Sequence, residues 1–320
     1  MLASRHGSSS SAAGLIMVVS SRSSSVRVAL ALLTIAGLAG CKEEAVDKSP
    51  APHAAGIPAT SAPAISASDS TVFPTGPEGV EARRGFAILA ATRDSMPGYV
   101  GAGLRCFSCH LDNGRRANAI PLTGVYARYP NYNPRDNRVI SIQDRVNNCF
   151  RRSLAGRNIP IDGVQMNAIV EYLAVVSRNI PVGAHVAGEG MPTMVALTGD
   201  TSRGDAIYTQ RCARCHGDNG QGIPPATPLW GARSYSVGAS LARVSRAATF
   251  IRHNMPFDSA GVLSDQQAFD VAAYVVSHPR PDAPEKQLDF SAGGAPGDVP
   301  YNTKGHVAFN PPRLLPSAFR

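Results

Sequence analysis

The sequence feature that most constrains the fold is the pentapeptide pattern Cys-x-x-Cys-His, which occurs twice, at residues 106–110 and 212–216. The spacing suits covalent attachment of c-type haem, because two thiols a short loop apart add to the two vinyl groups and the adjacent histidine is held to bind iron. A single match would also fit a zinc half-site or a redox pair. Two matches in one chain predict two covalently attached haem c groups. The residues of these sites are Cys106, Cys109 and His110 in the first, and Cys212, Cys215 and His216 in the second.

The sequence around the two motifs repeats with them. The motifs lie 106 residues apart, and Asp112-Asn113-Gly114 recurs as Asp218-Asn219-Gly220 at the same offset. Self-similarity at a fixed period indicates one structural unit used more than once. The chain is therefore predicted to be a tandem repeat of one haem domain.

Both halves carry helical patterns. Amphipathic segments precede the motifs at about 79–95 and 202–211, and apolar residues at helical spacing close each half. We expect Asp162 to cap the first closing helix, and Ser264 with Gln267 to form a capping box for the second. The predicted fold is all-α, with two tandem cytochrome c-type haem domains. Gly 30 and Pro 25 predict long irregular loops as well.

The N-terminal region is typical of an exported protein. Residues 26–40 follow Arg22 and contain Arg27, are otherwise largely apolar and are too short to span a bilayer, so they indicate a secretory signal, for which Met17 is a candidate start. Leu38-Ala39-Gly40-Cys41 resembles the bacterial lipoprotein signal, in which the cysteine is acylated and holds the protein on a membrane surface. A membrane-anchored periplasmic lipoprotein is expected. Ordinary cleavage into a soluble periplasmic form is the alternative.

These patterns divide the chain into five parts. A signal peptide at 1–40 precedes a Pro/Ala/Ser-rich tether at 41–76, which has too few large apolar residues to fold and is expected to be disordered. The first haem domain takes 77–190 and the second takes 191–285. An irregular tail at 286–320 is expected to be extended on the domain surface or mobile. The formal net charge of +8 is too modest to indicate nucleic-acid binding.

The second axial ligands are expected to differ between the two haems. A haem iron held by one histidine needs another ligand unless the position is kept open for chemistry. In the second domain the candidate is Met255, in a polar Asn-Met-Pro turn 39 residues after the haem histidine. The repeat offset places Cys149 at the matching position of the first domain. Met166 and Met96 compete for the first iron, but neither occupies the repeat-equivalent place.

Arginine is concentrated around Cys149. Residues 111–160 contain nine arginines and three aspartates. The arginine fork donates hydrogen bonds in pairs and stays charged, which favours multi-oxygen anions. The pattern predicts an anion-binding pocket at the first haem, with a solvated basic face whose partners are haem propionates as the alternative. Arg145 is the strongest candidate, because a helix starting after Ser141 would place it on the same face as Cys149.

At this point the residues resemble the thiosulfate dehydrogenase family, exported dihaem cytochromes c that couple two thiosulfate anions into tetrathionate. Some members run better as tetrathionate reductases. The resemblance covers about residues 80–285. It rests on both haem motifs, on the run DRVNNCFRRS at 144–153, and on the run FIRHNMP at 250–256 followed by LSD at 263–265. The run around Cys149 is the specific part, since the haem motifs alone fit many cytochromes.

The resemblance implies roles for individual residues. Cys149 would be the distal ligand of the active-site haem, while Arg135, Arg145 and Ser153 would hold the substrate. The arginines would offset the repulsion between two dianions in a partly desolvated pocket. A thiolate ligand stabilises ferric iron, so electrons would pass from this haem to the Met255-ligated haem. They would then leave to a soluble c-type cytochrome or a similar acceptor.

The sequence departs from some relatives in one respect. Those relatives carry a lysine next to the distal methionine, which exchanges with it upon oxidation. Here the neighbour is Asn254, and no lysine occurs between Lys48 and Lys286. A lysine switch at the second haem is therefore not expected.

Two other functions compete with this interpretation. A non-enzymatic dihaem electron carrier would have methionine at both distal positions, which the repeat contradicts. A haem-thiolate subunit of a sulfur-oxidising multienzyme system would share the cysteine ligand but would need a partner chain to complete its site.

Overall fold

A computed structural model describes residues 73–318 of the chain. The predictions for the signal peptide, for acylation of Cys41 and for the tether before residue 73 lie outside the described residues and stay predictions. Among the helices of 73–318, none is both long and apolar enough to cross a membrane.

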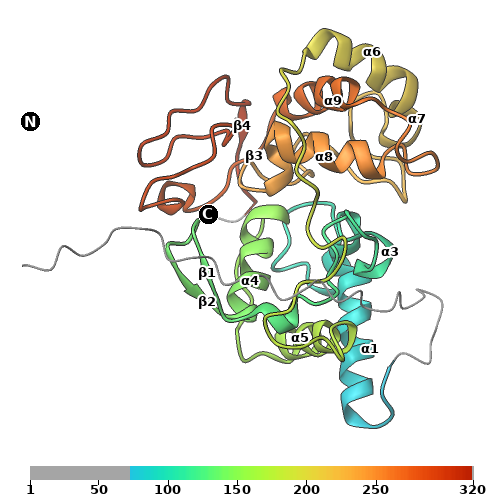
Figure 1. The fold of residues 1–320 in the computed structure, drawn as a ribbon, viewed down its shortest axis with the longest axis vertical. Coiled ribbons are helices and arrows are strands. Elements are labelled where there is room, and N and C mark those ends of the chain that lie inside the picture. The colour runs from blue at the N-terminus through green and yellow to red at the C-terminus, as the bar shows by residue number, and fades with distance from the viewer. Residues whose placement is uncertain (1–72, 319–320) are drawn as a thin grey trace, which may run out of the picture. The chain divides into compact units, whose positions relative to one another are not determined.

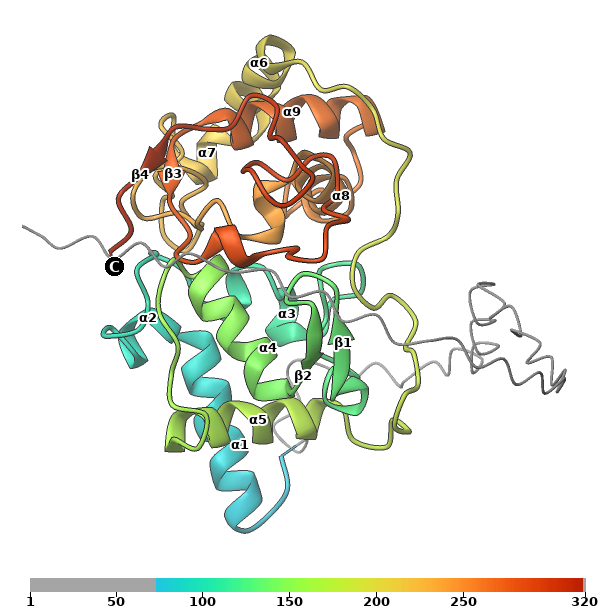
Figure 2. The same ribbon diagram turned by 90° about the vertical axis from the view of Figure 1, so that its left-hand side faces the viewer.

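The first haem domain is built on two helices that cross at a glycine. α1 (Pro77–Ala90) packs against α5 (Val164–Val176), as Figures 1 and 2 show. A Cβ atom on Gly85 would lie 2.0 Å from the carbonyl oxygen of Ala168, so only glycine lets the two backbones come this close. The rest of the domain consists of α2 (Thr92–Ser95), η2 (Cys106–Ser108), α3 (Leu111–Gly114), η3 (Tyr126–Arg128), β1 (Asn131–Asn133), β2 (Arg138–Ile140), α4 (Ile142–Asn148) and the π-helical turn η4 (Cys149–Ser153).

The second haem domain repeats this arrangement. α6 (Thr201–Arg211) packs against α9 (Asp265–Ser277), and a Cβ atom on Gly204 would lie 2.1 Å from the carbonyl oxygen of Asp270. α8 (Val244–Asn254) packs against α9 as well, and α7 (Ala213–His216) and η5 (Ser240–Ala242) complete the domain. The helices expected at 79–95 and 202–211 are therefore confirmed.

The two predicted helix caps have different outcomes. Ser264 and Gln267 form the expected capping box, in which the Gln267 N–H donates to Ser264 Oγ at 3.2 Å. The prediction for Asp162 is wrong, because α5 begins at Val164 and Gly163 occupies the N-cap position. Asp162 lies one residue too early for its carboxylate to accept from the first turn.

The C-terminal tail is packed against the second domain. β3 (Arg280–Pro281) pairs in parallel with β4 (Leu314–Leu315), and η6 (Lys286–Leu288) follows β3. A separate apolar cluster packs the tail against the domain. The buried members of this cluster are Val237, Ala283, Phe290, Val299 and Tyr301. Figures 1 and 2 show the tail looping beside α8, where Asp298 accepts from the Ser245 N–H at 3.0 Å. The described part of the tail is thus extended and wrapped on the domain.

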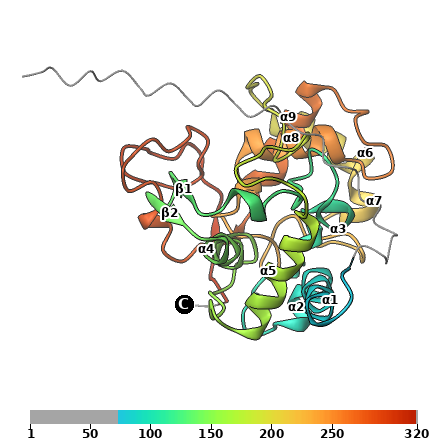
Figure 3. The same ribbon diagram turned by 60° about the horizontal axis from the view of Figure 1, so that its bottom comes forward.

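The tail also reaches the first domain. β1 and β2 form an antiparallel hairpin whose turn holds Arg135, and the Phe290 N–H donates to the Arg135 carbonyl oxygen at 2.8 Å. Figure 3 shows this hairpin beside the loops of the tail. Segment 231–242 makes a second link, since Tyr235, Ala239 and Ala242 belong to the hydrophobic core of the first domain. The helical fold with few strands agrees with the prediction from the sequence.

Candidate functional site

Each haem motif presents a histidine whose Nδ1 atom is held by a carbonyl group. His110 Nδ1 donates to the Ile120 carbonyl oxygen at 2.5 Å, and His216 Nδ1 donates to the Thr227 carbonyl oxygen at 2.8 Å. With Nδ1 as the donor, Nε2 keeps the lone pair that a metal ion needs. The two histidines are therefore oriented alike, as ligands held by backbone groups.

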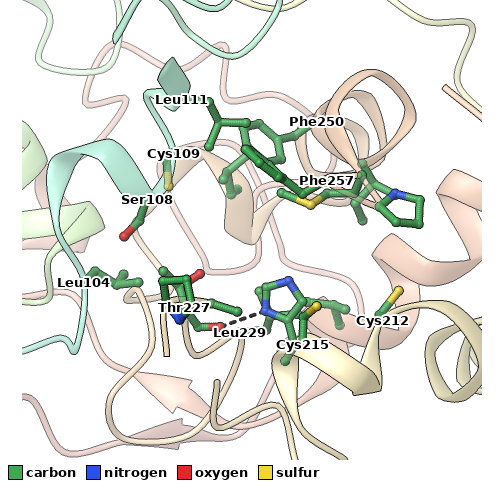
Figure 4. A pocket seen from close by; sticks show the side chains of 18 of the residues that line it. Leu104, Ser108, Cys109, Leu111, Cys212, Cys215, Thr227, Leu229, Phe250 and Phe257 are labelled. Atoms are coloured by element: carbon green, nitrogen blue, oxygen red, sulfur yellow. Dashed lines mark hydrogen bonds between the residues drawn. The ribbon is translucent and has the colours of Figure 1, made fainter. Parts of the chain in front are cut away.

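Three of the four motif cysteines, Cys106, Cys109 and Cys212, are partly buried free thiols, and Cys215 is exposed. Burial raises the pKa of Cys106 and of Cys109 to about 12, and the pKa of Cys212 to about 11. Catalytic and redox-active cysteines have lowered pKa values, so a redox pair fits these sites poorly. Figure 4 shows Cys212 and Cys215 on one side of a cavity, with Phe250 and Phe257 across from them. Free thiols at this spacing fit thioether attachment of haem.

The cavity of the second domain has a volume of about 730 Å³. This size lies within the range of pockets that enclose small molecules and cofactors. His216 of α7 and Met255 at the end of α8 both line it. Most of the wall is apolar, through Leu104, Phe107, Tyr208, Leu229, Tyr235, Leu241, Phe250, Ile251, Val271 and Val275. The residues present fit an apolar macrocycle with a histidine and a methionine at its metal.

One wall of this cavity belongs to the first haem motif. Ser108 and Cys109 line it together with Leu111 of α3 (Figure 4). The attachment site of the first haem thus borders the cavity of the second.

Cys149 directly follows a capped helix and lies near His110 of the first haem motif. Ser141 caps α4, with the Asp144 N–H donating to Ser141 Oγ at 3.0 Å, so the helix begins where the sequence predicts. Cys149 is the residue directly after α4, as Met255 is the residue directly after α8, so each follows a helix of its own domain, and their predicted roles as matching ligands stay predictions. The Cys149 side chain hydrogen-bonds with His110, so the predicted ligand faces the haem histidine.

The surroundings of Cys149 favour its thiolate form. Arg145 Nη1 donates to Cys149 Sγ at 2.8 Å. Burial by itself raises the pKa of Cys149, but the charge of Arg145 and the hydrogen bond with His110 outweigh it, and the pKa falls to about 6. The Cys149 charge in turn raises the pKa of Arg145. The site therefore combines a sulfur anion with a buried guanidinium.

Arg145 has an aromatic neighbour that sequence reasoning missed. Burial raises the pKa of Tyr129, and the charges of Arg145 and Cys149 act on it in opposite directions. Tyr129 lies just before β1, in a stretch with no motif or periodicity to single it out.

Arg135 is held in an ion-pair network with the tail. Its Nε donates to Asp289 at 2.9 Å and its Nη2 donates to the Gly238 carbonyl oxygen at 2.7 Å and to the Tyr301 hydroxyl. Arg152 donates to the same buried Asp289 at 2.5 Å and to Asp136 at 2.8 Å. The contacts described for Arg135 therefore lead to the tail, and its predicted role in holding substrate stays a prediction.

The residues that anchor this network were missed from the sequence. Asp289 and Tyr301 lie in the tail, to which the sequence assigned no function, and the Tyr301 hydroxyl donates to Asp289 at 2.7 Å. The charge of this region carried no signal, because residues 281–320 contain four acidic and four basic residues.

Ser153 ends the π-helical turn that Cys149 begins. In this turn the Leu154 N–H donates to the Cys149 carbonyl oxygen at 2.9 Å, five residues back. Such turns are rare and often occur at functional sites. The wider turn keeps Ser153 near the face of Cys149, but its predicted contact with substrate stays a prediction.

Two family models match the chain. Residues 100–182 match the model described as SoxA/TsdA, cytochrome c domain, and residues 199–275 match cytochrome c oxidase, cbb3-type, subunit III. Both describe cytochromes c, and the matched segments contain the two haem motifs. The chain is thus a cytochrome with covalently bound haem c in both domains.

Several proteins resemble the chain over most of its length. The thiosulfate dehydrogenase of Allochromatium vinosum is 39% identical over 229 residues, which are 68% of this chain and 85% of that protein. The thiosulfate dehydrogenase of Psychrobacter arcticus is 38% identical over 250 residues, which are 75% of this chain and 76% of that protein.

A solved structure shares the fold. The thiosulfate dehydrogenase (TsdBA) of Marichromatium purpuratum, in its as-isolated form, matches with a TM-score of 0.64 and 34% identity. The match covers 68% of this chain and 50% of that chain, so this chain spans about half the length of that protein.

Proposed function

The chain belongs to the thiosulfate dehydrogenase family, and we propose that it joins two thiosulfate anions through their sulfane sulfurs into one tetrathionate, releasing two electrons. The reverse reaction uses the same site. The observation that carries this proposal is the pair of Arg145 and Cys149 beside His110, at 2.8 Å between Nη1 and Sγ. A partly buried thiolate next to a partly buried guanidinium supports sulfur-anion chemistry better than simple electron carriage.

The residues that hold the cofactors follow from the two sites. Cys106 and Cys109 would attach the first haem, and Cys212 and Cys215 the second. His110 and Cys149 would hold the iron of the first haem, and His216 and Met255 that of the second. When bound, haem c would supply one-electron redox chemistry, with Cys149 favouring a lower potential at the first haem than Met255 at the second, and an external acceptor would take the electrons.

The protein side chains assemble the anions. Arg145 donates to sulfonate oxygens and offsets the repulsion between two dianions in a site with little water, where each charge interaction is strong. Ser153, on the same turn as Cys149, donates a further hydrogen bond to a sulfonate oxygen. Arg135 contributes through Nη1, the guanidinium nitrogen that none of its described hydrogen bonds uses, because Asp289 and Gly238 engage the other two.

The cellular setting completes the proposal. The protein is exported to the periplasm and held on a membrane surface by an acylated Cys41, and a soluble c-type cytochrome takes the electrons. The basis for export and acylation is the sequence before residue 42, with its apolar run and its Leu-Ala-Gly-Cys ending.

A stoichiometry measurement on the haem-loaded protein tests the proposal. With ferricyanide as acceptor, we expect two thiosulfate consumed and two ferricyanide reduced for each tetrathionate formed. Sulfate, a dianion without a sulfane sulfur, serves as the control and should reduce no ferricyanide. Absence of thiosulfate-dependent reduction by the protein alone would contradict the proposal and favour an electron carrier or a subunit that needs a partner chain.

A further inference from the structure

A fully buried arginine lies at the edge of the second haem cavity. Arg280 of β3 has an exposed fraction of 0%. Its guanidinium carbon lies 4.6 Å from the ring centroid of Tyr235, and its Nη2 donates to the Val275 carbonyl oxygen at 2.8 Å. Tyr235 and Val275 both line the cavity that contains His216. The guanidinium is therefore in contact with two residues of the cavity wall.

Two of the three guanidinium nitrogens have no partner. Within residues 73–318, Nε and Nη1 of Arg280 are buried without a hydrogen-bond acceptor. A buried charge without a counter-ion is strongly unfavourable, and buried arginines are as a rule paired. Arg152, for comparison, is ion-paired with both Asp136 and Asp289. The position of Arg280 thus calls for an anion that the polypeptide does not supply.

The acidic residues of the cavity wall are engaged elsewhere. Asp112 accepts from Arg116 at 2.7 Å, and Asp258 accepts from Arg214 at 2.7 Å. The tail packs beside Arg280 as well. The Arg280 N–H donates to the Arg313 carbonyl oxygen at 3.1 Å, and β4 pairs with β3. Because Arg280 contacts two residues of the cavity wall, the acceptor is expected from the occupant of that cavity. A haem carries carboxylates of its own, on its two propionate groups.

We infer that Arg280 binds a propionate carboxylate of the second haem through Nε and Nη1. An arginine edge suits this role, because two adjacent N–H groups match the two oxygens of a carboxylate. Pairing neutralises a negative charge beside the iron and keeps it away from water. The inference concerns the cofactor and does not depend on which substrate the first domain takes.

The repeat has an arginine at the matching place of the first domain, but that arginine is not buried. Gly85 meets Ala168 and Tyr172 as Gly204 meets Asp270 and Tyr274, so α5 and α9 correspond at an offset of 102 residues. At this offset Arg178 is the counterpart of Arg280, and Arg178 is exposed whereas Arg280 is fully buried. At this place of the repeat, a buried guanidinium therefore occurs only in the second domain.

A crystal structure of the haem-loaded wild-type protein tests the inference without any variant. We expect a propionate oxygen of the second haem within about 3.2 Å of Nε or Nη1 of Arg280. Both propionates of that haem pointing away from Arg280, or an Arg280 paired with water, an inorganic anion or the first haem, would overturn it.

Potentiometry gives an independent readout. In Arg280→Gln the propionate charge is no longer compensated, so the midpoint potential of the His/Met-ligated haem should fall while that of the His/Cys-ligated haem stays unchanged. In Arg280→Lys the midpoint potential should return most of the way to the wild-type value. The matched control is Arg243→Gln, which removes a half-buried arginine of the same domain that pairs with Asp298, and its potentials should equal those of the wild type. An unchanged potential in Arg280→Gln, or a shift at the other haem, would overturn the inference.

Discussion

At the scale of single residues, the site depends on a pair four residues apart in which Arg145 favours the thiolate form of Cys149. Arg145 lies on α4 and Cys149 directly follows it, four residues further along, with 2.8 Å between Arg145 Nη1 and Cys149 Sγ. The guanidinium lowers the pKa of Cys149 to about 6 against the effect of burial. A helix face therefore supplies both the sulfur anion and the cation that offsets it.

Replacement of Arg145 tests this pair. In Arg145→Gln, we expect kcat/KM for thiosulfate to fall about 100-fold, because a buried charge contact with an anion is lost. The control is Arg138→Gln, which removes an exposed arginine that pairs with Asp144 at the other end of the same helix. Its kcat/KM should stay within about twofold of wild type, because exposed ion pairs contribute little. Equal losses in the two variants would indicate an effect of overall charge.

At the scale of elements, the helix before Cys149 is set by its cap. Asp144 accepts from Arg138 and from the Ser141 N–H, and the Arg138 hydrogen bond, acting against partial burial, lowers the pKa of Asp144 from 3.8 to about 2. The capping box fixes where α4 begins. The length of α4 then determines where Cys149, the residue after its last turn, is placed. The position of the sulfur is thus tied to a surface carboxylate more than one turn away.

This cap gives a pH dependence with a defined sign. Because the pKa of Asp144 is lower in the folded chain than in the unfolded chain, its carboxylate stabilises the fold above about pH 4, and this contribution is lost as the pH falls toward 2. We expect Asp144→Asn to lower the free energy of unfolding by about 1 kcal/mol at pH 7. Urea unfolding at several pH values should show the difference from wild type shrinking below pH 4. A difference that stays constant down to pH 2.5 would contradict this account.

At the scale of the whole molecule, the described tail joins the two haem domains. Asp289 is 4% exposed and pairs with Arg135 and Arg152, which lie 154 and 137 residues earlier in the chain. Arg152 belongs to the π-helical turn that begins at Cys149. Through Arg152, the Asp289 carboxylate of the tail therefore holds the turn that begins at Cys149.

Removal of this carboxylate should be costly. Asp289→Asn leaves two arginines without their shared partner, and we expect the free energy of unfolding to fall by about 3 kcal/mol. Glu285→Gln is the matched control, since Glu285 is an exposed residue just before the tail that pairs with Arg151, and its effect should stay below about 0.5 kcal/mol. Denaturant unfolding of both variants measures the difference. If the tail only covered the surface, Asp289→Asn and Glu285→Gln would lower the free energy of unfolding by similar small amounts.

The sequence predicted the local and repeated features well and the long-range ones poorly. The haem motifs, the capped helices and the equivalence of Cys149 with Met255 follow from spacing within one repeat, which sequence displays directly. The Asp289 network joins segments more than 130 residues apart, and no periodicity reports such contacts. The buried Arg280 was also missed, because a lone arginine before a proline carries no sign in the sequence that it is buried.

The central claim is that thiosulfate is oxidised at the Cys149 site, and the most direct test compares tetrathionate formation by the wild-type protein and by Cys149→Gly, both loaded with haem. We expect the variant to bind two haems and to form tetrathionate at least about 100-fold more slowly than wild type. Loss of the charge-transfer and thiolate signatures at the first haem alone should accompany the loss of activity. A variant that retains two haems and forms tetrathionate at the wild-type rate would contradict the claim.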